Sequence, residues 1–267
     1  MSTDQRSKDW YNQRAEEYTK HVRNPDDSIY HSLYEKPAMY RLLPNLKDKT
    51  VISLGCGSGE DCKYLKSQGA KLVIGIDSSE KLIEIAKNSY PQCDFHVMDM
   101  EKMDFDNASF DFAYSSLAIH YIEDWHQVFQ EVFRILKPGG YFLFSCNHPV
   151  YSALDIVEDD GDIKISQLSR KRTKSTDAVE IIGDYMSHKP IIMPDGSDMA
   201  VTTWHKSIGE IAKEIADTGF LISDIVEPKP LSKMKDISPT KYETLIKIPN
   251  FIIFRLLKPQ STTLQSS

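Results

Sequence analysis

The sequence predicts a doubly wound α/β fold, in which a mostly parallel seven-stranded sheet has an antiparallel hairpin at one edge and carries an inserted cap. Between residues 50 and 140, short apolar runs alternate with helical patterns, which is typical of parallel strands joined by crossover helices. This rhythm breaks after Cys146 and resumes near residue 207. A chain of 267 residues with 40% hydrophobic side chains can therefore form one core that carries an insertion.

Short runs rich in β-branched and aromatic residues are the candidate strands. They occupy 50–54, 71–76, 93–98, 110–115, 141–146, 220–227 and 250–258. The last two are separated by a connection without a clear helical pattern, whereas a parallel pair would need a crossover. We therefore expect these two strands to pair antiparallel at one edge of the sheet.

Three helices are predicted between the strands, over 60–68, 78–89 and 124–137. Each ends where residues stop a helix, namely at Gly69, before Pro91 and at the turn 138–140. A further helix begins with Ser207 and Glu210 at the spacing of a capping box.

The N-terminal segment 8–22 is predicted to form one helix with Trp10, Arg14 and Tyr18 on a single face. Packing of this face into the core is the simplest interpretation. The predicted organisation is an N-terminal helical segment (1–45), a core domain (46–149 and 205–258), an inserted cap (150–204) and a disordered tail (259–267).

Charge and composition disfavour several classes of protein. The formal charge of −7 disfavours nucleic acid as a partner, because a chain that binds phosphates usually has a basic face. The basic run 170–174 is more simply a solvated stretch than an anion site. The four cysteines form no CxxC pair, which favours buried thiols and no metal site. The polar start and the lack of an apolar run of about 18 residues predict a cytoplasmic protein without a membrane span.

The segment 51–60 runs from a strand into a helix and has Gly55, Gly57 and Gly59 at the turn. Glycine lets the backbone bend sharply and approach a ligand without an intervening Cβ. A dinucleotide fingerprint, GxGxxG, needs glycine or alanine at residue 60, where Glu60 would instead repel a pyrophosphate. The spacing favours a nucleoside without phosphates, and an ordinary tight turn is the alternative.

Two acidic residues follow the next two strands. Asp77 ends the second strand about 20 residues after the glycine turn, where a carboxylate accepts the hydroxyls of a ribose. Asp99 follows the third strand and is placed to accept from an adenine amino group. The alternatives are a helix N-cap for Asp77 and a turn aspartate for Asp99. Open α/β sheets bind ligands at this carboxyl edge.

These motifs resemble the class I S-adenosylmethionine-dependent methyltransferases, in particular the group that acts on small molecules. The resemblance covers residues 10 to 145 and consists of LGCGSG, IGID, FHVMDMEKMDF, FDFAYSSLAIHYIED and LKPGGYFLFS in order. It implies the cofactor S-adenosyl-L-methionine, bound by the core domain 46–149 and 205–258. It also implies that the N-terminal segment 1–45 lies over the cofactor and that the cap 150–204 is a substrate lid. The cofactor-binding residues that it implies are Tyr11, Tyr18, Gly55, Cys56, Gly57, Gly59, Asp77, Ser78, Asp99, Met100 and Ser115.

The implied reaction is transfer of a methyl group to an oxygen or nitrogen atom of a small metabolite by in-line displacement. A base is needed only for some acceptors. His148 and then His120 are the catalytic candidates because both follow strands at the carboxyl edge, and His205 is a third. A hydrogen-bonded structural histidine is the alternative for each. Tyr121, Tyr151 and Trp204 shape an acceptor pocket or pack in the core.

Other functions remain open from the sequence alone. The acceptor is a tRNA or a protein in one alternative, although YSSL at 114–117 departs from the pattern of enzymes that methylate DNA bases. In another, the chain binds S-adenosylmethionine without turnover. A nicotinamide-dependent oxidoreductase is disfavoured by Glu60. The acceptor and the oligomeric state are not predicted.

Overall fold

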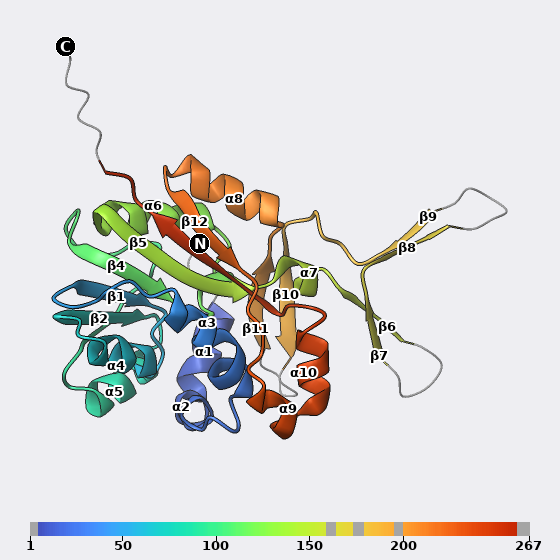
Figure 1. The fold of residues 1–267 in the computed structure, drawn as a ribbon, viewed down its shortest axis with the longest axis horizontal. Helices are drawn as coiled ribbons and strands as arrows, with labels where there is room; N and C mark the ends of the chain where they lie inside the picture. Colours follow the sequence, from blue (N-terminus) through green and yellow to red (C-terminus); the bar gives the residue numbers. More distant parts are fainter. Residues whose placement is uncertain (1–4, 159–163, 173–178, 195–199, 261–267) are drawn as a thin grey trace, which may run out of the picture.

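The computed structural model describes residues 5–158, 164–172, 179–194 and 200–260. Its centre is a seven-stranded sheet (Figure 1). In spatial order the strands are β12 (Leu221–Val226), β13 (Phe251–Leu257), β5 (Leu136–Asn147), β4 (Phe110–Ser115), β1 (Thr50–Leu54), β2 (Leu72–Asp77) and β3 (Asp94–Val97). The predicted fold class is confirmed.

The sheet is parallel from β5 to β3 and antiparallel at its other edge. β13 pairs antiparallel with both β5 and β12, as the sequence predicted for the last two strands. β5 begins earlier than expected, because Leu136 already pairs with Phe110 and the Gly139 amide donates to Lys258 O at 2.8 Å. Contacts with β4 and with the residue after β13 therefore extend the strand into the predicted turn.

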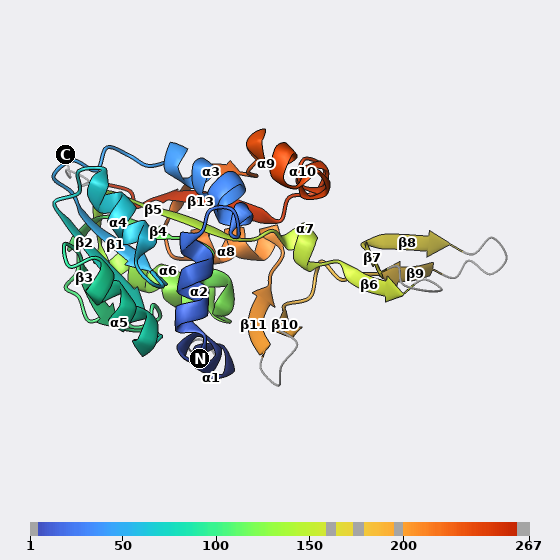
Figure 2. The ribbon, with the colours of Figure 1, turned by 90° about the horizontal axis from the view of Figure 1, so that it is seen from below.

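Helices cover both faces of the sheet (Figures 1 and 2). On one face, Phe142 and Phe144 of β5 pack with α6 (Trp125–Ile135) and α8 (Ile208–Asp217). On the other, Leu143 packs with α3 (Lys36–Arg41), α4 (Glu60–Ser67) and α5 (Glu80–Ser89). Successive residues of the strand thus pack into the cores on opposite faces of the sheet, because side chains alternate along a pleated strand. Each fully buried large apolar side chain contributes about 1.5 to 3 kcal/mol.

The helix ends follow the local chemistry of the sequence. Ser79, Asp124 and Ser207 are the N-caps of α5, α6 and α8, and each side chain accepts a backbone N–H of the first turn. The capping interaction between Ser207 and Glu210 N is therefore confirmed, at 3.2 Å.

The N-terminal segment differs from the single helix that was predicted over 8–22. It forms α1 (Gln5–Gln13) and α2 (Ala15–Arg23), with a break at Arg14, which has φ −106° and ψ 18°. The backbone bonds Arg14 N to Trp10 O and Tyr18 N to Arg14 O nevertheless cross the break. A π-helical turn, η1 (His31–Glu35), then leads into α3.

The connection between β12 and β13 contains two short helices, α9 (Lys233–Ile237) and α10 (Pro239–Leu245). The sequence predicted no clear helix there, which was wrong. Met234 and Leu245 bury their side chains against Leu33 and Tyr34 of η1. Packing against η1 stabilises helices that are too short to form alone.

The segment 150–204 begins inside α7 (Pro149–Ser152) and forms three two-stranded ribbons. They are β6 (Asp155–Glu158) with β7 (Lys164–Gln167), β8 (Ser169–Arg172) with β9 (Val179–Ile182), and β10 (Lys189–Pro194) with β11 (Ala200–His205). β11 packs on α1 and on η2 (Ile119–Tyr121), whereas β6 to β9 extend away from the body (Figures 1 and 2). Part of the basic run 170–174 and the tail 261–267 lie outside the described residues. No helix in the described ranges is long and apolar enough to cross a membrane.

Candidate active site

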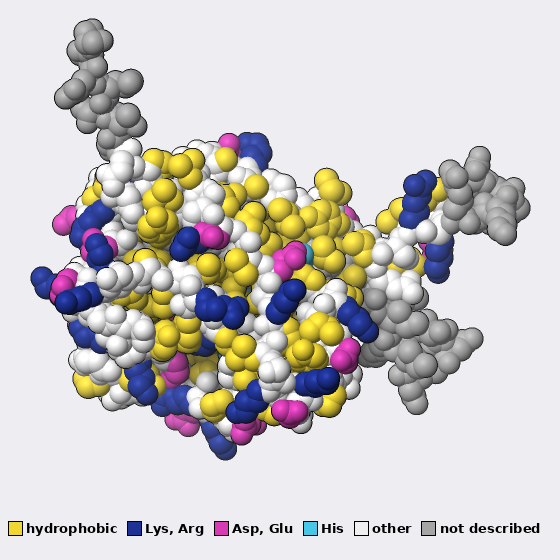
Figure 3. Space-filling view, in the orientation of Figure 1, with side chains coloured by type: hydrophobic (Ala, Val, Ile, Leu, Met, Phe, Trp, Pro, Cys, Tyr) yellow, Lys and Arg dark blue, Asp and Glu magenta, His cyan; other side chains and the backbone are white. Residues whose placement is uncertain are grey.

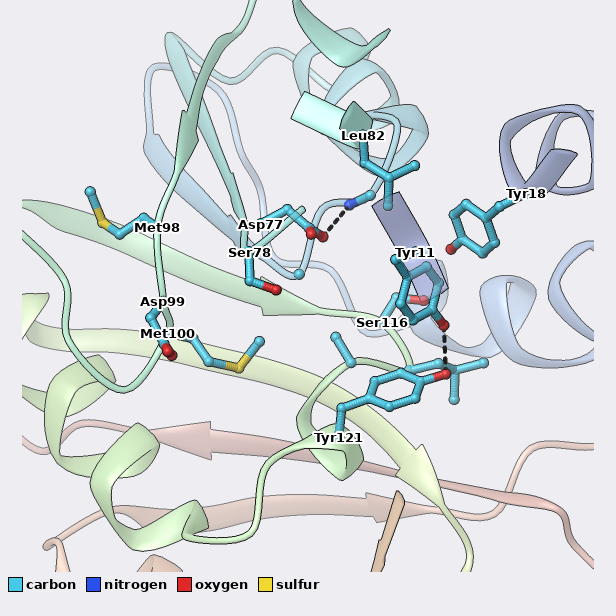
Figure 4. A pocket seen from close by; sticks show the side chains of 14 residues that line it. Tyr11, Tyr18, Asp77, Ser78, Leu82, Met98, Asp99, Met100, Ser116 and Tyr121 are labelled. Carbon is cyan, nitrogen blue, oxygen red and sulfur yellow. Dashed lines mark hydrogen bonds between the residues drawn. The ribbon is translucent and has the colours of Figure 1, made fainter. Parts of the chain in front are cut away.

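A pocket of about 620 Å³, counting its open mouth, lies at the carboxyl edge of the parallel strands. The loops that follow β1, β2, β3 and β4 form its floor, and the N-terminal helices and η2 form its roof (Figure 4). It is lined by Tyr11, Tyr18, Gly55, Gly57, Asp77, Ser78, Leu82, Met98, Asp99, Met100, Ser116, Leu117, Ala118 and Tyr121.

The turn after β1 requires glycine for two different reasons. Gly55 has φ +63°, and a Cβ there would lie 2.3 Å from the Cβ of Ala118. Gly57 has φ +53° and faces the ring of Tyr18. Both conformations are costly for residues with a side chain. The sequence therefore bends here so that backbone, not side chains, faces the pocket.

Asp77 is half-buried at the end of β2 and is held by two backbone amides. Its Oδ2 accepts from Gly57 N at 2.9 Å (Figure 4), and its Oδ1 accepts from Ser79 N at 2.9 Å. Burial raises the pKa of the carboxyl, and the amides of Ser79 and Gly57 oppose this rise. The N-cap of α5 is Ser79, so Asp77 does not serve as that cap. A carboxylate oxygen accepts more than one hydrogen bond, so each oxygen of Asp77 can accept a further donor from the pocket.

Asp99 lies after β3 at the other end of the pocket, with Met100 beside it (Figure 4). Its Oδ1 accepts from Glu101 N at 3.0 Å, which is the turn interaction that the sequence left as an alternative. The side chain also lines the pocket, so the turn and the binding interpretations are compatible. Met98 and Met100 supply the apolar surface that a purine ring needs.

Three tyrosines form the roof. The hydroxyls of Tyr11 and Tyr121 are 2.7 Å apart, and Tyr11 also meets Tyr18 edge to face at 5.3 Å between centroids. Burial raises the pKa values of all three hydroxyls, so they stay neutral. The lining contains Asp77 and Asp99 but no Lys or Arg among the described residues. This pocket suits a ligand with hydroxyl and amino donors and no phosphate.

Comparisons with known proteins agree with this geometry. Residues 52–144 match a family model described as "Methyltransferase domain". A methyltransferase from Mesorhizobium loti, described in its crystal structure as S-adenosylmethionine dependent, aligns with a TM-score of 0.69 and 27% identity, over 87% of this chain and 99% of that one. Residues 52–144 are therefore a methyltransferase domain, and the chain is similar to S-adenosylmethionine-dependent methyltransferases.

Two curated relatives match over shorter stretches. Mouse arsenite methyltransferase is 36% identical over 131 residues, which are 43% of this chain and 34% of the mouse protein. A ubiquinone biosynthesis O-methyltransferase from Coxiella burnetii is 29% identical over 143 residues, which are 52% of this chain and 57% of that protein. The stretches of this chain that match thus span between about a third and somewhat over half of these relatives.

Most of the predicted cofactor residues of the methyltransferase domain come together in the pocket. Those that line it are Tyr11, Tyr18, Gly55, Gly57, Asp77, Ser78, Asp99 and Met100. Their contacts with the cofactor stay predictions. The structure brings them together from α1, α2 and the ends of three successive strands, as the order of the family motifs implied.

Three predicted residues lie outside this pocket. Cys56 is buried behind the turn, and a Cβ on Gly59 would meet Phe95 and Tyr90. Ser115 is fully buried and donates to Leu54 O at 3.1 Å. Its neighbour Ser116, which follows the last residue of β4, lines the pocket instead.

None of the histidine candidates lines the pocket. His148 is the N-cap of α7: Nδ1 accepts from Val150 N at 3.1 Å, and Nε2 lies 3.1 Å from Glu227 Oε1. His120 Nδ1 accepts from Asn147 N, and burial lowers the pKa of His120 to about 3. His205 is buried between Ser152 and Tyr185 O. The catalytic roles of these histidines stay predictions.

Sequence reasoning missed several lining residues. Leu82 and Met98 are apolar residues in apolar runs, so the sequence does not distinguish them from residues of the core. Ser116, Leu117 and Ala118 follow β4, and Tyr121 was named only for an acceptor pocket. Of the three aromatic residues named for that pocket, Tyr151 is exposed and Trp204 packs on His188. No group of His, Cys, Asp and Glu in the described ranges is arranged to hold a metal.

Proposed function

We propose that the protein transfers a methyl group from S-adenosylmethionine to an oxygen or nitrogen atom of a small molecule. The observation that carries this proposal is the fixed carboxylate of Asp77. Both of its oxygens are held by backbone amides at the end of β2, above the glycine turn and opposite Asp99. A ribose is recognised in this way at the carboxyl edge of open α/β sheets.

The residues present fit this cofactor. Asp77 would hold the ribose hydroxyls, and Asp99 with Met98 and Met100 would hold the adenine. Gly55 and Ser116 also line the pocket, and they would face the methionine part. When bound, the cofactor supplies an electrophilic methyl group on a sulfonium.

The roof would exclude water and orient the reacting groups. Neutral aromatic faces above a sulfonium add about 0.5 to 2 kcal/mol of cation–π attraction. The bond between Tyr11 and Tyr121 joins α1 to the loop after β4 and holds two of these rings in place. Orientation of donor and acceptor supplies about 7 to 11 kcal/mol of the barrier reduction in such reactions. Most of the catalysis then comes from positioning rather than from a strong base.

A small acceptor is favoured over a nucleic acid by the surface charge. On the face shown in Figure 3, Lys and Arg side chains are interspersed with Asp and Glu. The net charge of −7 points the same way. The names of the mouse and Coxiella relatives, which refer to arsenite and to an O-methyltransferase of ubiquinone biosynthesis, support an acceptor that is small.

Turnover of labelled S-adenosylmethionine against a library of metabolites, scored by release of S-adenosylhomocysteine, tests the proposal. We expect release with at least one acceptor, and its loss in Asp77→Ala. Binding of S-adenosylhomocysteine without turnover of any acceptor would favour a binding module. Turnover that appears only with tRNA or protein would move the acceptor to those alternatives.

A further inference from the structure

Glu35 is a fully buried acid that no part of the proposed chemistry uses. It is the last residue of the π-helical turn η1, in which Lys36 N bonds to His31 O. Its Oε1 accepts from Ser145 Oγ at 2.5 Å and from Ser116 Oγ at 3.0 Å. Its Oε2 has no hydrogen-bond partner among the described residues. Such π-helical turns frequently occur at functional sites.

The two serines connect Glu35 to the loop that lines the pocket after β4. Ser145 Oγ accepts from Leu117 N at 3.0 Å, and Leu117 has φ +49°, a left-handed conformation that is unfavourable for leucine. This bend places Ala118 against Gly55. Three consecutive pocket residues, 116–118, therefore depend on hydroxyls that donate to one carboxylate.

The direction of these bonds gives the carboxylate a specific role. Each serine has a single hydroxyl proton, and both protons point at Glu35 Oε1. Ser145 can therefore face Leu117 N only as an acceptor, which is what the bent loop requires. Ser116 likewise presents lone pairs to the pocket. Bonds to an ionised carboxylate are stronger than bonds to its neutral form.

The surroundings allow Glu35 to change charge near neutral pH. Burial raises the pKa of Glu35 to about 7, and the nearby Lys36 opposes the rise. Burial lowers the pKa of His31 to about 4, so His31 stays neutral. Although burial acts against it, Asp61 and Glu35 raise the pKa of Lys36, so Lys36 stays charged. The titratable and charged groups around Glu35 are His31, Lys36, Tyr40, Asp61 and Tyr114.

We infer that Glu35 is a positioning residue of the methyl-transfer site, which holds the loop 116–118 against the glycine turn through Ser145 and Ser116. The ionised form holds the loop firmly, and protonation loosens it. The inference rests on the proposed function for the identity of the site, but the hold on the loop is a property of the chain itself.

Amide hydrogen exchange of Leu117, followed by NMR without ligand between pH 6 and 8.5, tests the hold directly. After correction for intrinsic exchange, we expect protection to rise at least threefold as the pH passes about 7. In Glu35→Gln, we expect protection to be lower and independent of pH. The wild-type profile needs no variant, so poor folding of a variant leaves the test intact.

Glu60→Gln is the matched control, because Glu60 is a carboxylate that faces the neighbouring cavity with Lys36 and Asp61 and binds Arg23 rather than the loop. In this variant, protection of the Leu117 amide should rise near pH 7 as it does in the wild type. Protection of Leu117 that does not rise near pH 7 in the wild type would overturn the inference. A rise that is still present in Glu35→Gln would overturn it as well.

Calorimetry with S-adenosylhomocysteine at pH 6 and pH 8 tests the connection to the site. We expect binding to be at least threefold tighter at pH 8 in the wild type, and this difference to vanish in Glu35→Gln. If protection of Leu117 changes with pH but the affinity for S-adenosylhomocysteine does not, Glu35 is not a positioning residue of the site. If S-adenosylhomocysteine does not bind at either pH while protection of Leu117 still rises near pH 7, the proposed function is contradicted. The role of Glu35 in holding the loop is then not affected.

Discussion

The floor and the roof of the pocket are built in different ways. Gly55, Asp77 and Asp99 of the floor follow three neighbouring parallel strands, and backbone bonds fix the turn and the carboxylates. The roof joins Tyr11 to Tyr121, which lie 110 residues apart, through their side chains. The sheet thus dictates the floor, whereas tertiary packing assembles the roof. Changes to the floor should therefore cost more binding than changes to the roof.

The largest effect is expected at the glycine turn. Gly55→Ala places a Cβ 2.3 Å from that of Ala118 at φ +63°, so the loop after β4 must move. We expect the affinity for S-adenosylhomocysteine in calorimetry to fall roughly 100-fold or more. Gly69→Ala is the control, since it has φ +94° and only ordinary contacts with Lys47, far from the pocket. Equal losses in both variants would refute the special role of Gly55.

Glu35 joins η1 to the loop after β4, and its removal should affect stability with a predictable sign. Ionisation of Glu35 strengthens its bonds to the loop, but it places a charge in a buried position that the unfolded chain exposes to water. Because burial thus raises the pKa of Glu35 to about 7, the free energy of unfolding is highest below the unfolded pKa and falls as the pH rises through about 7. Relative to Glu35→Gln, the wild type should lose about 3 kcal/mol of unfolding free energy between pH 4.5 and pH 8. Urea denaturation at both pH values measures this difference. If the difference in unfolding free energy between the wild type and Glu35→Gln is the same at both pH values, Glu35 does not titrate with a raised pKa in the folded chain.

Asp77→Ala should weaken binding of S-adenosylhomocysteine tenfold or more while the fold survives, because hydrogen bonds to a charged group contribute about 1.5 to 3 kcal/mol each. Asp111→Ala is the matched control. Asp111 also accepts a strand amide, Thr50 N at 2.9 Å, but at the opposite edge of the sheet. An affinity that is unchanged in Asp77→Ala would remove this carboxylate from the site.

His148→Ala should lower the free energy of unfolding by about 1 kcal/mol, since α7 loses its N-cap. The affinity for S-adenosylhomocysteine should stay within about twofold, because His148 does not line the pocket. Thermal unfolding and calorimetry measure the two quantities. A fall in turnover of tenfold or more at unchanged affinity would support the catalytic role that the sequence predicted.

The smallest effect is expected in the roof. Tyr121→Phe removes one neutral hydrogen bond to Tyr11 and keeps both rings, so binding should weaken by less than about tenfold. Tyr11→Phe and the double variant complete a mutant cycle whose coupling reports this bond alone. A loss as large as that of Asp77→Ala would mean that the roof, and not the floor, dominates binding.

Gly55, Asp77 and Asp99 of the floor could be predicted from the sequence because each lies at the end of a strand with its own local pattern. The roof could be predicted only in part, since Tyr11 and Tyr18 came from the family resemblance. The strand pattern also does not say how the chain turns after its last residue, so Ser115 was chosen where Ser116 lines the pocket.

Glu35 left no local signal, because its partners lie 81 and 110 residues away. The helices α9 and α10 escaped prediction for the same reason. Their stability comes from Leu33 and Tyr34 in the N-terminal segment and not from their own short patterns.

A crystal structure of the complex with S-adenosylhomocysteine tests the central claim most directly. We predict that both ribose hydroxyls donate to the carboxylate of Asp77 and that the adenine lies beside Asp99 and Met100. A ligand bound elsewhere, or a ribose turned away from Asp77, would contradict the account.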